Sequence, residues 1–313
     1  MKSSESLQYP LVSLVIPCYN HVHFLRECLD SLATQTLNHW EAIVVDDDSP
    51  DGESISIIIE SFRDQRIRII HHTENRGLAA ARNNGIRAAR GQFVLPLDAD
   101  DKIAPEYLGK TVTYLLEHFD CDCVFPDFFH FGTRQGAFQF QLGDTRSLLQ
   151  QQWLPGSGTL LRKELWERVG GYCEAEELRA GNEDWDFYLA AAEIGFIAGH
   201  IPEPLYYYRQ HKESMVTRLR YMEYRTREYM YTRHRPLFDH YGIKKEFLAE
   251  GYQRSAEAAL SRGERLRTIY LAIKVAQDST RRGIAIRLMV NALLPSYVLQ
   301  MIRKGRDLYQ HWY

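Results

Sequence analysis

Acidic residues gather at two points of the chain, each directly after a short apolar segment. They are Asp46, Asp47 and Asp48 in the first group and Asp98, Asp100 and Asp101 in the second. Two carboxylates on alternate residues, such as Asp98 and Asp100, can share one Mg²⁺ or Mn²⁺ ion whose remaining ligands are phosphate oxygens. Like charges so close together repel each other, and a bound cation or several hydrogen-bond donors would relieve the repulsion. A solvated acidic turn is the alternative interpretation.

Other residues suit the same chemistry. At a strand end, an Asp of the group 46–48 can accept the imide N–H of a uracil or thymine ring, because an ionised carboxylate is only an acceptor; an Asx turn is the alternative. Arg82 can reach a diphosphate, unless it is an ordinary surface arginine. Glu183 and Asp184 begin a predicted helix, where one can face a cleft and take up a proton while the other is a structural hydrogen-bond acceptor.

The segments that carry these residues alternate between two hydrophobic periods. Short apolar, β-branched runs predict strands, and apolar residues at helical spacing predict the helices between them. In chain order, the predicted elements are strand 12–19, helix 22–36, strand 40–49, helix 53–63, strand 66–72, helix 77–90 and strand 91–101. This alternation predicts an α/β fold with a mostly parallel sheet and helices on both faces, in which ligands bind beyond the carboxyl ends of the strands.

The rest of the chain is less regular. A helix is predicted at 182–195, starting at Asn182 with an acidic first turn that suits the helix dipole. An aromatic strand is predicted at 205–211. After about residue 218 the sequence is helical in pattern to its end and rich in Arg and Tyr.

Five short motifs occur in an order that resembles one known family. They are PCYN (17–20), VVDDDSPDG (44–52), NRGLAAARNNG (75–85), LDADD (97–101) and NEDWD (182–186). Together they resemble the family-2 glycosyltransferases of the GT-A fold, over roughly residues 10–214. The resemblance implies an inverting transferase that uses a nucleotide-diphosphate sugar, UDP-linked, and a Mn²⁺ or Mg²⁺ cofactor. It implies a nucleotide-sugar half at about 10–101 and an acceptor half at about 102–214, whereas the C-terminal helical extension at 215–313 is predicted from its own helical pattern and positive charge.

The resemblance also implies a role for each matching residue. Nucleotide-sugar binding is implied for Pro17, Tyr19, Asn20, Asp47, Arg82, Asp98 and Asp100. Asp47 would meet the base and Arg82 the pyrophosphate, and Asp184 would be the catalytic base. Metal binding is implied for Asp100 first, with Asp98 and His211. The acceptor side is implied for Gly156, Ser157, Glu183 and Trp185, with the alternative that aromatic residues such as Trp185 belong to the core.

One position departs from the family pattern. The family usually has Gly after the two acids of the first motif, whereas this chain has Asp48. The carboxylate of Asp48 would either alter the preference for the nucleotide base or point into solvent.

The charge is distributed unevenly along the chain. Its 313 residues carry a net charge of −3, which argues against a protein that coats nucleic acid. Residues 1–214 have a net charge of −13, and residues 215–313 have a net charge of +10. An acidic body followed by a basic extension indicates two parts, of which the second can meet an anionic surface or present a solvated helical face.

Cysteine usage and hydropathy indicate a cytoplasmic protein. The five cysteines are an odd number and form no zinc pattern, so reduced thiols are expected. Residues 1–10 lack the apolar segment of a secretory signal. The most apolar stretch, 284–302, is interrupted by Arg287, Asn291 and Pro295, so it is not expected to span a membrane.

That stretch predicts peripheral attachment to the inner face of the membrane. Apolar residues are flanked by arginines and lysines and followed by amphipathic aromatics, a composition that suits an anionic bilayer surface. The residues concerned are Arg281, Arg282, Ile284, Leu288, Leu294, Tyr297, Leu299, Ile302, Arg303, Lys304, Arg306, Tyr309 and Trp312. A saccharide or lipid-linked saccharide would then be the acceptor. Packing on the rest of the chain, or on a second copy in a homo-oligomer, is the alternative.

Two other functions are compatible with part of the pattern. A phosphohydrolase could use Asp98 as nucleophile and Asp100 as acid–base, but no Ser or Thr follows the motif to hold the phosphoryl group. A non-catalytic nucleotide-binding scaffold is the second alternative. The presence of Asp98, Asp100, Asp184 and Arg82 together argues against it.

Overall fold

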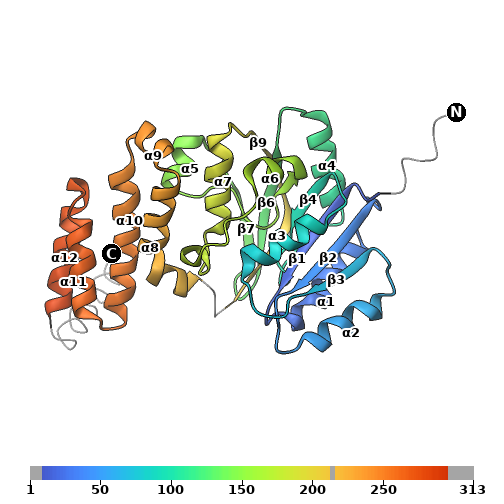
Figure 1. Ribbon diagram of the computed structural model, residues 1–313, viewed down its shortest axis with the longest axis horizontal. Helices are drawn as coiled ribbons and strands as arrows, with labels where there is room; N and C mark the ends of the chain where they lie inside the picture. Colours follow the sequence, from blue (N-terminus) through green and yellow to red (C-terminus); the bar gives the residue numbers. More distant parts are fainter. Residues whose placement is uncertain (1–8, 212–215, 295–313) are drawn as a thin grey trace, which may run out of the picture. The chain divides into compact units, whose positions relative to one another are not determined.

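The computed structural model describes residues 9–211 and 216–294 of the chain, with side chains in the second range from residue 219 onward. The chain divides into two compact units, residues 1–212 and residues 213–313. The first unit contains a curled sheet with helices on its faces, and the second is helical (Figure 1).

The first four long strands of the sheet are parallel. They are β1 (Val12–Cys18), β2 (Trp40–Asp46), β3 (Ile67–His71) and β4 (Phe93–Pro96), in the spatial order β3-β2-β1-β4. β1 and β2 are almost entirely buried, which explains their continuous apolar sequences. Cys18 lies opposite Asp46 in the β1–β2 register, so both strands end at the same edge of the sheet. The predicted acidic motifs follow β2 and β4, the two neighbours of β1, so both lie at this edge of the sheet.

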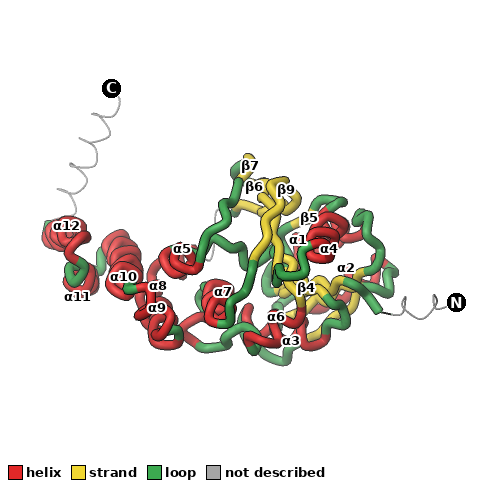
Figure 2. The backbone as a smooth tube through the Cα atoms, turned by 90° about the horizontal axis from the view of Figure 1, so that it is seen from above, coloured by secondary structure: helices red, strands yellow, loops and turns green. Residues whose placement is uncertain are grey.

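Helices cover both faces of these strands, as predicted (Figure 2). Helices α1 (Val22–Ala33), α2 (Gly52–Phe62) and α4 (Tyr107–Glu117) contribute to one apolar cluster with Leu14 and Ile16 of β1. Helix α3 (Leu78–Ala88) lies on the other face. A Cβ atom at Gly85 would come within 2.3 Å of Val15, so the glycine lets α3 lie directly on the sheet.

The second half of the sheet is mixed, and the sequence predicted it poorly. It adds β8 (Leu160–Arg162), β6 (Cys123–Gly132), β9 (Ala198–Gln210) and β5 (Lys102–Ile103), and β7 (Gly136–Phe138) pairs with β6. Only β6 and β9 pair in parallel here; the other pairs are antiparallel. β6 was not predicted, and only the end of β9 was. Pro126 and a shift of register after it interrupt the β6 pattern.

Three short helices and one longer helix complete the first unit. They are α5 (Thr145–Gln150), α6 (Lys163–Val169), the 3₁₀ helix η1 (Glu176–Leu178) and α7 (Glu183–Glu193). Helix α7 follows Asn182, as expected. Asn182 has a positive φ of 72° and makes no side-chain cap, so the left-handed turn, and not an amide cap, sets the start of this helix.

The second unit consists of helices. They are α8 (Val216–Arg233), α9 (Arg235–Tyr241), α10 (Lys244–Ser261), α11 (Arg265–Val275), the 3₁₀ helix η2 (Ser279–Arg281) and α12 (Arg282–Leu293). Part of its core is formed by Tyr252, Leu271, Val275 and Leu288. No helix in the described part of the chain combines the length and apolar character that crossing a membrane requires. All five cysteines are described, and none forms a disulfide.

The structure limits the predicted membrane segment. Leu288, which we expected at a membrane surface, is 2% exposed and packs in the core of its own unit, and Ile284 packs against the same cluster. Residues 295–313, which include the predicted Tyr297, Leu299, Ile302 and Trp312, lie outside the described residues.

Candidate active site

The Asp98–Asp101 segment leaves the end of β4 and is fixed from behind by the loop before β8. The backbone N–H of Asp98 donates to Ser157 Oγ at 2.9 Å, and this hydroxyl is hydrogen-bonded to that of Tyr206 at 2.6 Å. Tyr206 in turn donates to Asp101 at 2.6 Å. The structure thus places Ser157, predicted on the acceptor side, directly behind Asp98.

Asp101 is a structural residue that the sequence analysis did not single out. It is 1% exposed and accepts from the Tyr206 hydroxyl and from the backbone N–H of Arg209 at 2.7 Å. Burial, together with repulsion from Asp100 and Asp98, raises the pKa of Asp101 well above its ordinary value. The third acid of the motif therefore ties the β4 edge to β9, while the first two remain at the rim.

Arg82 joins the two carboxylate motifs. Its guanidinium donates to Glu183 through Nη1 and to Asp98 Oδ1 through Nη2 at 3.0 Å, although the side chain is only 3% exposed. Burial alone would lower the pKa of Arg82, but the carboxylates of Asp98 and Glu183 outweigh this effect and raise it. Its Nε atom has no hydrogen-bond partner among the described residues. Arg82 is therefore not a surface arginine.

The adjacent carboxylates Glu183 and Asp184 have different environments. Glu183 is 4% exposed and is held by Arg82, and burial raises its pKa to about 7. Asp184 is half-buried, and its two oxygens accept from the Gln152 amide and from the backbone N–H of Trp185, both at 2.8 Å. A Cβ atom at Gly156 would lie 2.0 Å from Asp184 Oδ2, so Gly156 provides the space for this carboxylate.

Trp185 lies in the core. It is 4% exposed, and its indole N–H donates to the Leu148 carbonyl of α5 at 2.8 Å. This position agrees with the alternative given in the sequence analysis, that aromatic residues such as Trp185 belong to the core. Trp185 therefore presents no open ring face beside Asp184.

Asp100 and His211 meet at the mouth of the D-x-D segment. His211 Nε2 lies 2.7 Å from Asp100 Oδ2, and His21 Nδ1 lies 3.9 Å from the same oxygen. Arg209, two residues before His211, donates to the Asp100 carbonyl at 2.6 Å. One carboxylate and one or two imidazoles are a donor set that a divalent ion can use. No group of three close ligands is already assembled among the described residues.

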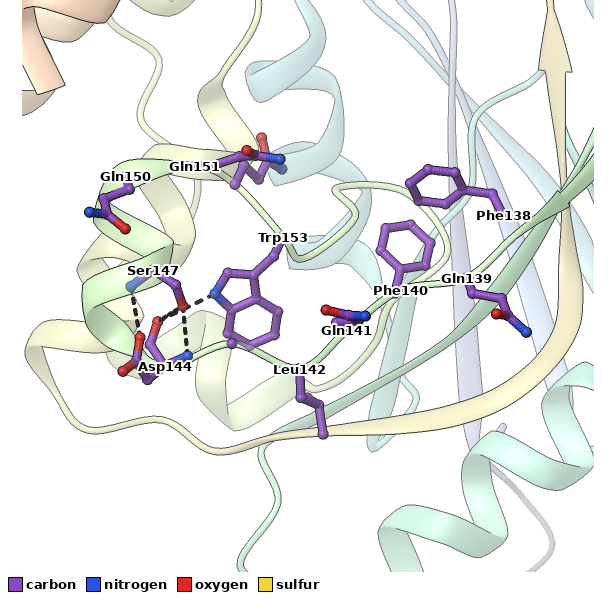
Figure 3. A pocket seen from close by; sticks show the side chains of 12 residues that line it. Phe138, Gln139, Phe140, Gln141, Leu142, Asp144, Ser147, Gln150, Gln151 and Trp153 are labelled. Carbon is purple, nitrogen blue, oxygen red and sulfur yellow. Dashed lines mark hydrogen bonds between the residues drawn. The ribbon is translucent and has the colours of Figure 1, made fainter. Parts of the chain in front are cut away.

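An open groove of about 860 Å³ lies between residues 138–144 and 147–153. Its wall includes Gln152, whose amide also donates to Asp184. Figure 3 shows the groove between the end of β7, the loop 139–144 and helix α5, with the indole of Trp153 at its centre. Sequence reasoning did not find this groove, because its residues have no periodic pattern.

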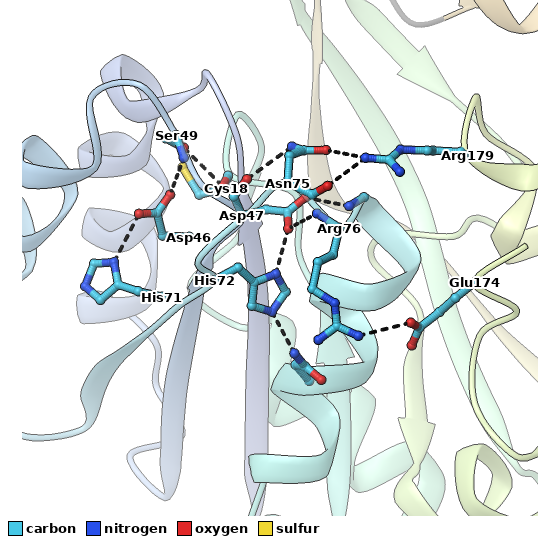
Figure 4. A network of polar contacts seen from close by, with 12 residues as sticks. Cys18, Asp46, Asp47, Ser49, His71, His72, Asn75, Arg76, Glu174 and Arg179 are labelled. Atoms are coloured by element: carbon cyan, nitrogen blue, oxygen red, sulfur yellow. Dashed lines mark hydrogen bonds and ion pairs between the residues drawn. The ribbon is translucent and has the colours of Figure 1, made fainter. Parts of the chain in front are cut away.

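Asp47 is buried in a polar network at the end of β2 (Figure 4). It accepts from the backbone N–H groups of Arg76 and Gly77 at 2.9 and 2.8 Å, and its Oδ1 lies 2.6 Å from His72 Nδ1. The Asn84 amide donates to His72 Nε2 at 2.7 Å, so the ring carries its proton on Nδ1 and donates to Asp47. Asp47 thus fixes the loop before α3, the helix that carries Arg82. With these three hydrogen bonds, the Asp47 carboxylate has little capacity left to accept another.

The residues of the PCYN segment lie at the end of β1. Pro17 is half-buried in the strand, Tyr19 is 45% exposed, and Asn20 is exposed with a positive φ of 59°. Asp48 is also exposed, with a φ of 62°. This conformation favours glycine and tolerates Asp, so the backbone explains why Asp48 stands where the resembling family usually has Gly. Its side chain is open to solvent.

Comparison with known proteins agrees with this geometry. Residues 13–170 match the family model described as glycosyl transferase family 2. The chain therefore belongs to glycosyltransferase family 2.

The relatives include one of similar sequence and two of similar fold. The uncharacterized glycosyltransferase EpsJ of Bacillus subtilis (strain 168) is 34% identical over 220 residues, which cover 66% of this chain and 63% of EpsJ. The structure of S. aureus TarS 1-349 has a TM-score of 0.64 at 20% identity, covering 94% of this chain and 91% of that chain. TarS 1-349 has also been solved in complex with UDP-GlcNAc.

The second structure of similar fold is the mannosyltransferase PcManGT from Pyrobaculum calidifontis in complex with GDP-Man and Mn²⁺. Its TM-score is 0.57 at 20% identity, and the match covers 91% of this chain and 86% of that chain. At such identities the similarity concerns the fold, which is that predicted from the sequence.

Proposed function

We propose that this protein transfers a sugar, with inversion, from a UDP-linked donor to a saccharide or lipid-linked saccharide. The observation that carries this proposal is the contact of Arg82 with both Asp98 and Glu183. Through it, one buried guanidinium links the D-x-D segment to the neighbour of Asp184. Donor-binding and proton-accepting groups then face one reaction centre.

Asp184 is the proposed base. Glu183 is occupied by Arg82, whereas Asp184 is half-buried and borders the open groove through Gln152. The carboxylate would take the proton of the acceptor hydroxyl as that oxygen attacks the anomeric carbon. Two hydrogen bonds and the space left by Gly156 fix its direction.

Asp100 and His211 are the residues that would hold a divalent cation. Their donor atoms converge at 2.7 Å, so the chain already brings an oxygen and a nitrogen ligand to one point. When bound, the ion would neutralise the charge that develops on the leaving diphosphate. The presence of Mn²⁺ in the similar PcManGT structure supports this assignment.

A uridine donor is proposed from the comparison with TarS, whose fragment of similar fold was solved with UDP-GlcNAc. Asp47, the residue expected to meet the base, already accepts three hydrogen bonds, so it leaves little capacity for the imide N–H of the base. The GDP-Man in the PcManGT structure makes a guanosine donor the natural competitor.

An assay of nucleotide release tests the proposed function. Purified protein is incubated with UDP-GlcNAc, UDP-Glc, UDP-Gal or GDP-Man and Mn²⁺, and free nucleoside diphosphate and inorganic phosphate are measured. We expect UDP release that disappears in excess chelator and in Asp100→Ala. Release of inorganic phosphate would identify a phosphohydrolase, and no release from any donor would favour the scaffold.

We also propose that the C-terminal unit attaches peripherally to an anionic membrane. Large apolar side chains are exposed along α11 and α12, at successive turns of each helix. They are Leu266, Tyr270, Ile273, Ile286, Val290 and Leu293. Residues 215–313 have a net charge of +10, which suits an anionic lipid surface.

The structure changes how this attachment is tested. Deleting residues 281–313 would remove α12, whose Ala285 and Leu288 belong to the core of the unit. Instead, Ile286→Ser/Leu293→Ser should weaken co-sedimentation with vesicles containing phosphatidylglycerol without unfolding the helices. Equal sedimentation of wild type and variant would rule out α12 as the attachment surface, and a concentration-dependent change of mass without lipid would indicate a homo-oligomer.

A further inference from the structure

The groove whose wall includes Gln152 is held in place by hydrogen bonds within its own walls. At the end of β7, the backbone N–H of Phe140 donates to Asp127, which is 3% exposed and also lies 2.7 Å from His200 Nε2. On the other side, Asp144 and Ser147 form a reciprocal cap at the start of α5. The loop between β7 and α5 is therefore anchored at both ends, and the groove is a built feature.

The side chains that line the groove present hydrogen-bonding groups and ring faces together. Among the described residues, none hydrogen-bonds the side-chain amides of Gln139, Gln141 and Gln151. Figure 3 shows the Gln141 amide pointing toward the indole of Trp153. Phe138 is 45% exposed at the outer end. An amide both donates and accepts, as a sugar hydroxyl does, and an aromatic face packs against the C–H surface of a sugar ring.

The charge of the lining distinguishes between classes of ligand. Asp144 is the only charged side chain among the groove residues that the structure describes, and its carboxylate is used by the cap. No lysine or arginine lines the groove. A polyphosphate or uronate chain would lack counter-charges here and would meet a carboxylate, whereas a neutral saccharide needs neither.

We propose that this groove binds a neutral saccharide segment of the acceptor and directs its terminal hydroxyl to Asp184. The role of Asp184 in this inference rests on the proposed function. The binding of a saccharide in the groove does not depend on that function. Gln152 connects the two places, since it is one of the residues that line the groove and its amide donates to Asp184. The acceptor is thereby a glycan that is uncharged next to the attacking sugar.

Ligand-observed NMR tests the binding directly, without turnover. The probes are three neutral trisaccharides (maltotriose, cellotriose and triacetylchitotriose) and the anionic trigalacturonate. We expect at least one neutral trisaccharide to bind and trigalacturonate not to bind. In Gln141→Ala the dissociation constant for the neutral trisaccharide should rise by about tenfold, because one or two hydrogen bonds are lost. Gln135→Ala, an exposed glutamine outside the groove, is the matched control.

A second variant guards against misfolding. Trp153 contacts Phe125, so Trp153→Ala can disturb the wall, whereas Trp153→Phe keeps an aromatic face and should retain more binding than Trp153→Ala. Binding of trigalacturonate in preference to the neutral sugars, or neutral binding unaffected by Gln141→Ala, would overturn the inference.

The same variants distinguish this inference from the proposed function. Gln135→Ala should leave slow, acceptor-independent UDP release unchanged, because this exposed glutamine lies outside the groove. If the wild type releases no nucleotide from any donor but binds a neutral saccharide at Gln141, the proposed function fails and the groove assignment stands. If nucleotide is released but no saccharide binds, the groove assignment fails alone.

Discussion

Among the residues whose burial the structure describes, each unit of the molecule has one buried arginine, and the two arginines have different partners. Arg82 and Arg227 are both 2% exposed. Arg227 donates to Glu223, whose side chain is 4% exposed, and to the Phe247 carbonyl at 3.2 Å. Arg82 has two carboxylate partners, and the side chain of one of them, Asp98, is 31% exposed. Arg82 therefore connects the protein interior to an open edge.

The electrostatic consequences differ in sign. Burial lowers the pKa of Arg227 in spite of Glu223, whereas Asp98 and Glu183 raise that of Arg82. In the helical unit, Arg227 is packed in the interior, pairs with Glu223 of its own helix and links α8 to α10 through the Phe247 carbonyl. In the first unit the buried arginine instead links two carboxylates, one of which is partly exposed after β4.

The largest expected effect is on turnover and concerns Asp184, the neighbour of the Glu183 that is paired with Arg82. Asp184→Asn keeps the shape but removes the proton acceptor, so turnover should fall by roughly 10²–10⁴ while donor binding is unchanged. Steady-state kinetics and donor titration measure both. Glu223→Gln, the equivalent change beside Arg227, should leave turnover unaffected. A Glu183→Gln variant that loses far more turnover than Asp184→Asn, at equal stability, would show that Glu183 is the base.

The second prediction compares the arginines themselves. Removing one member of a buried ion pair leaves the other uncompensated, so Arg82→Met and Arg227→Met should each cost about 3–5 kcal/mol of unfolding free energy. Urea unfolding followed by circular dichroism measures this. In protein that remains folded at low temperature, only Arg82→Met should weaken nucleotide-sugar binding. Equal loss of binding in both variants would contradict the functional difference.

The third prediction concerns the space around the base. Gly156→Ala places a Cβ atom 2.0 Å from Asp184 Oδ2 and must displace that carboxylate. A displacement of about 1 Å can reduce turnover by roughly 10²-fold, which is the upper limit expected here. Gly283→Ala in α12, where the added atom meets nothing within 4 Å, is the control and should be neutral. Undiminished turnover in Gly156→Ala would remove Asp184 from the mechanism.

The smallest expected effect is a dependence of stability on pH. The pKa of Glu183 is raised to about 7, so its contribution to stability is complete below its ordinary pKa, about 4.3, and is lost as pH rises toward 7. Glu41 should behave in the opposite way: burial opposes ionisation, but hydrogen bonds from Arg90 and Ser13 outweigh it and lower the pKa. Its contribution is present above the ordinary pKa and lost as pH falls.

Thermal midpoints between pH 4 and 8 test both signs. Relative to Glu183→Gln, the wild type should lose stability as pH rises to about 7; relative to Glu41→Gln, it should lose stability as pH falls. Parallel curves for wild type and Glu183→Gln would show that Glu183 is ionised throughout.

The sequence predicted the first hundred residues well because β1, β2 and β4 are buried on both faces, β3 is partly buried, and the helices between them place apolar residues against the sheet. It did not predict β6, since Pro126 breaks the strand pattern, nor the full length of β9, whose first half contains Gly199 and Pro202. Parallel strands β1, β2 and β4 explain why the acidic motifs could be placed at one edge in advance. The link from Arg82 to Glu183 could not be predicted, because it joins residues 101 positions apart through tertiary packing alone.

The exposed, left-handed position of Asp48 has a consequence for how this protein can diversify. Glycine, asparagine and aspartate all adopt a φ of 62° at little cost, so mutation among them changes the charge there without moving the backbone. At most positions near a nucleotide, a substitution that changes the charge also changes the local shape. Position 48 is therefore a site at which selection, or a protein engineer, can adjust the electric potential over the proposed donor edge independently of the fold.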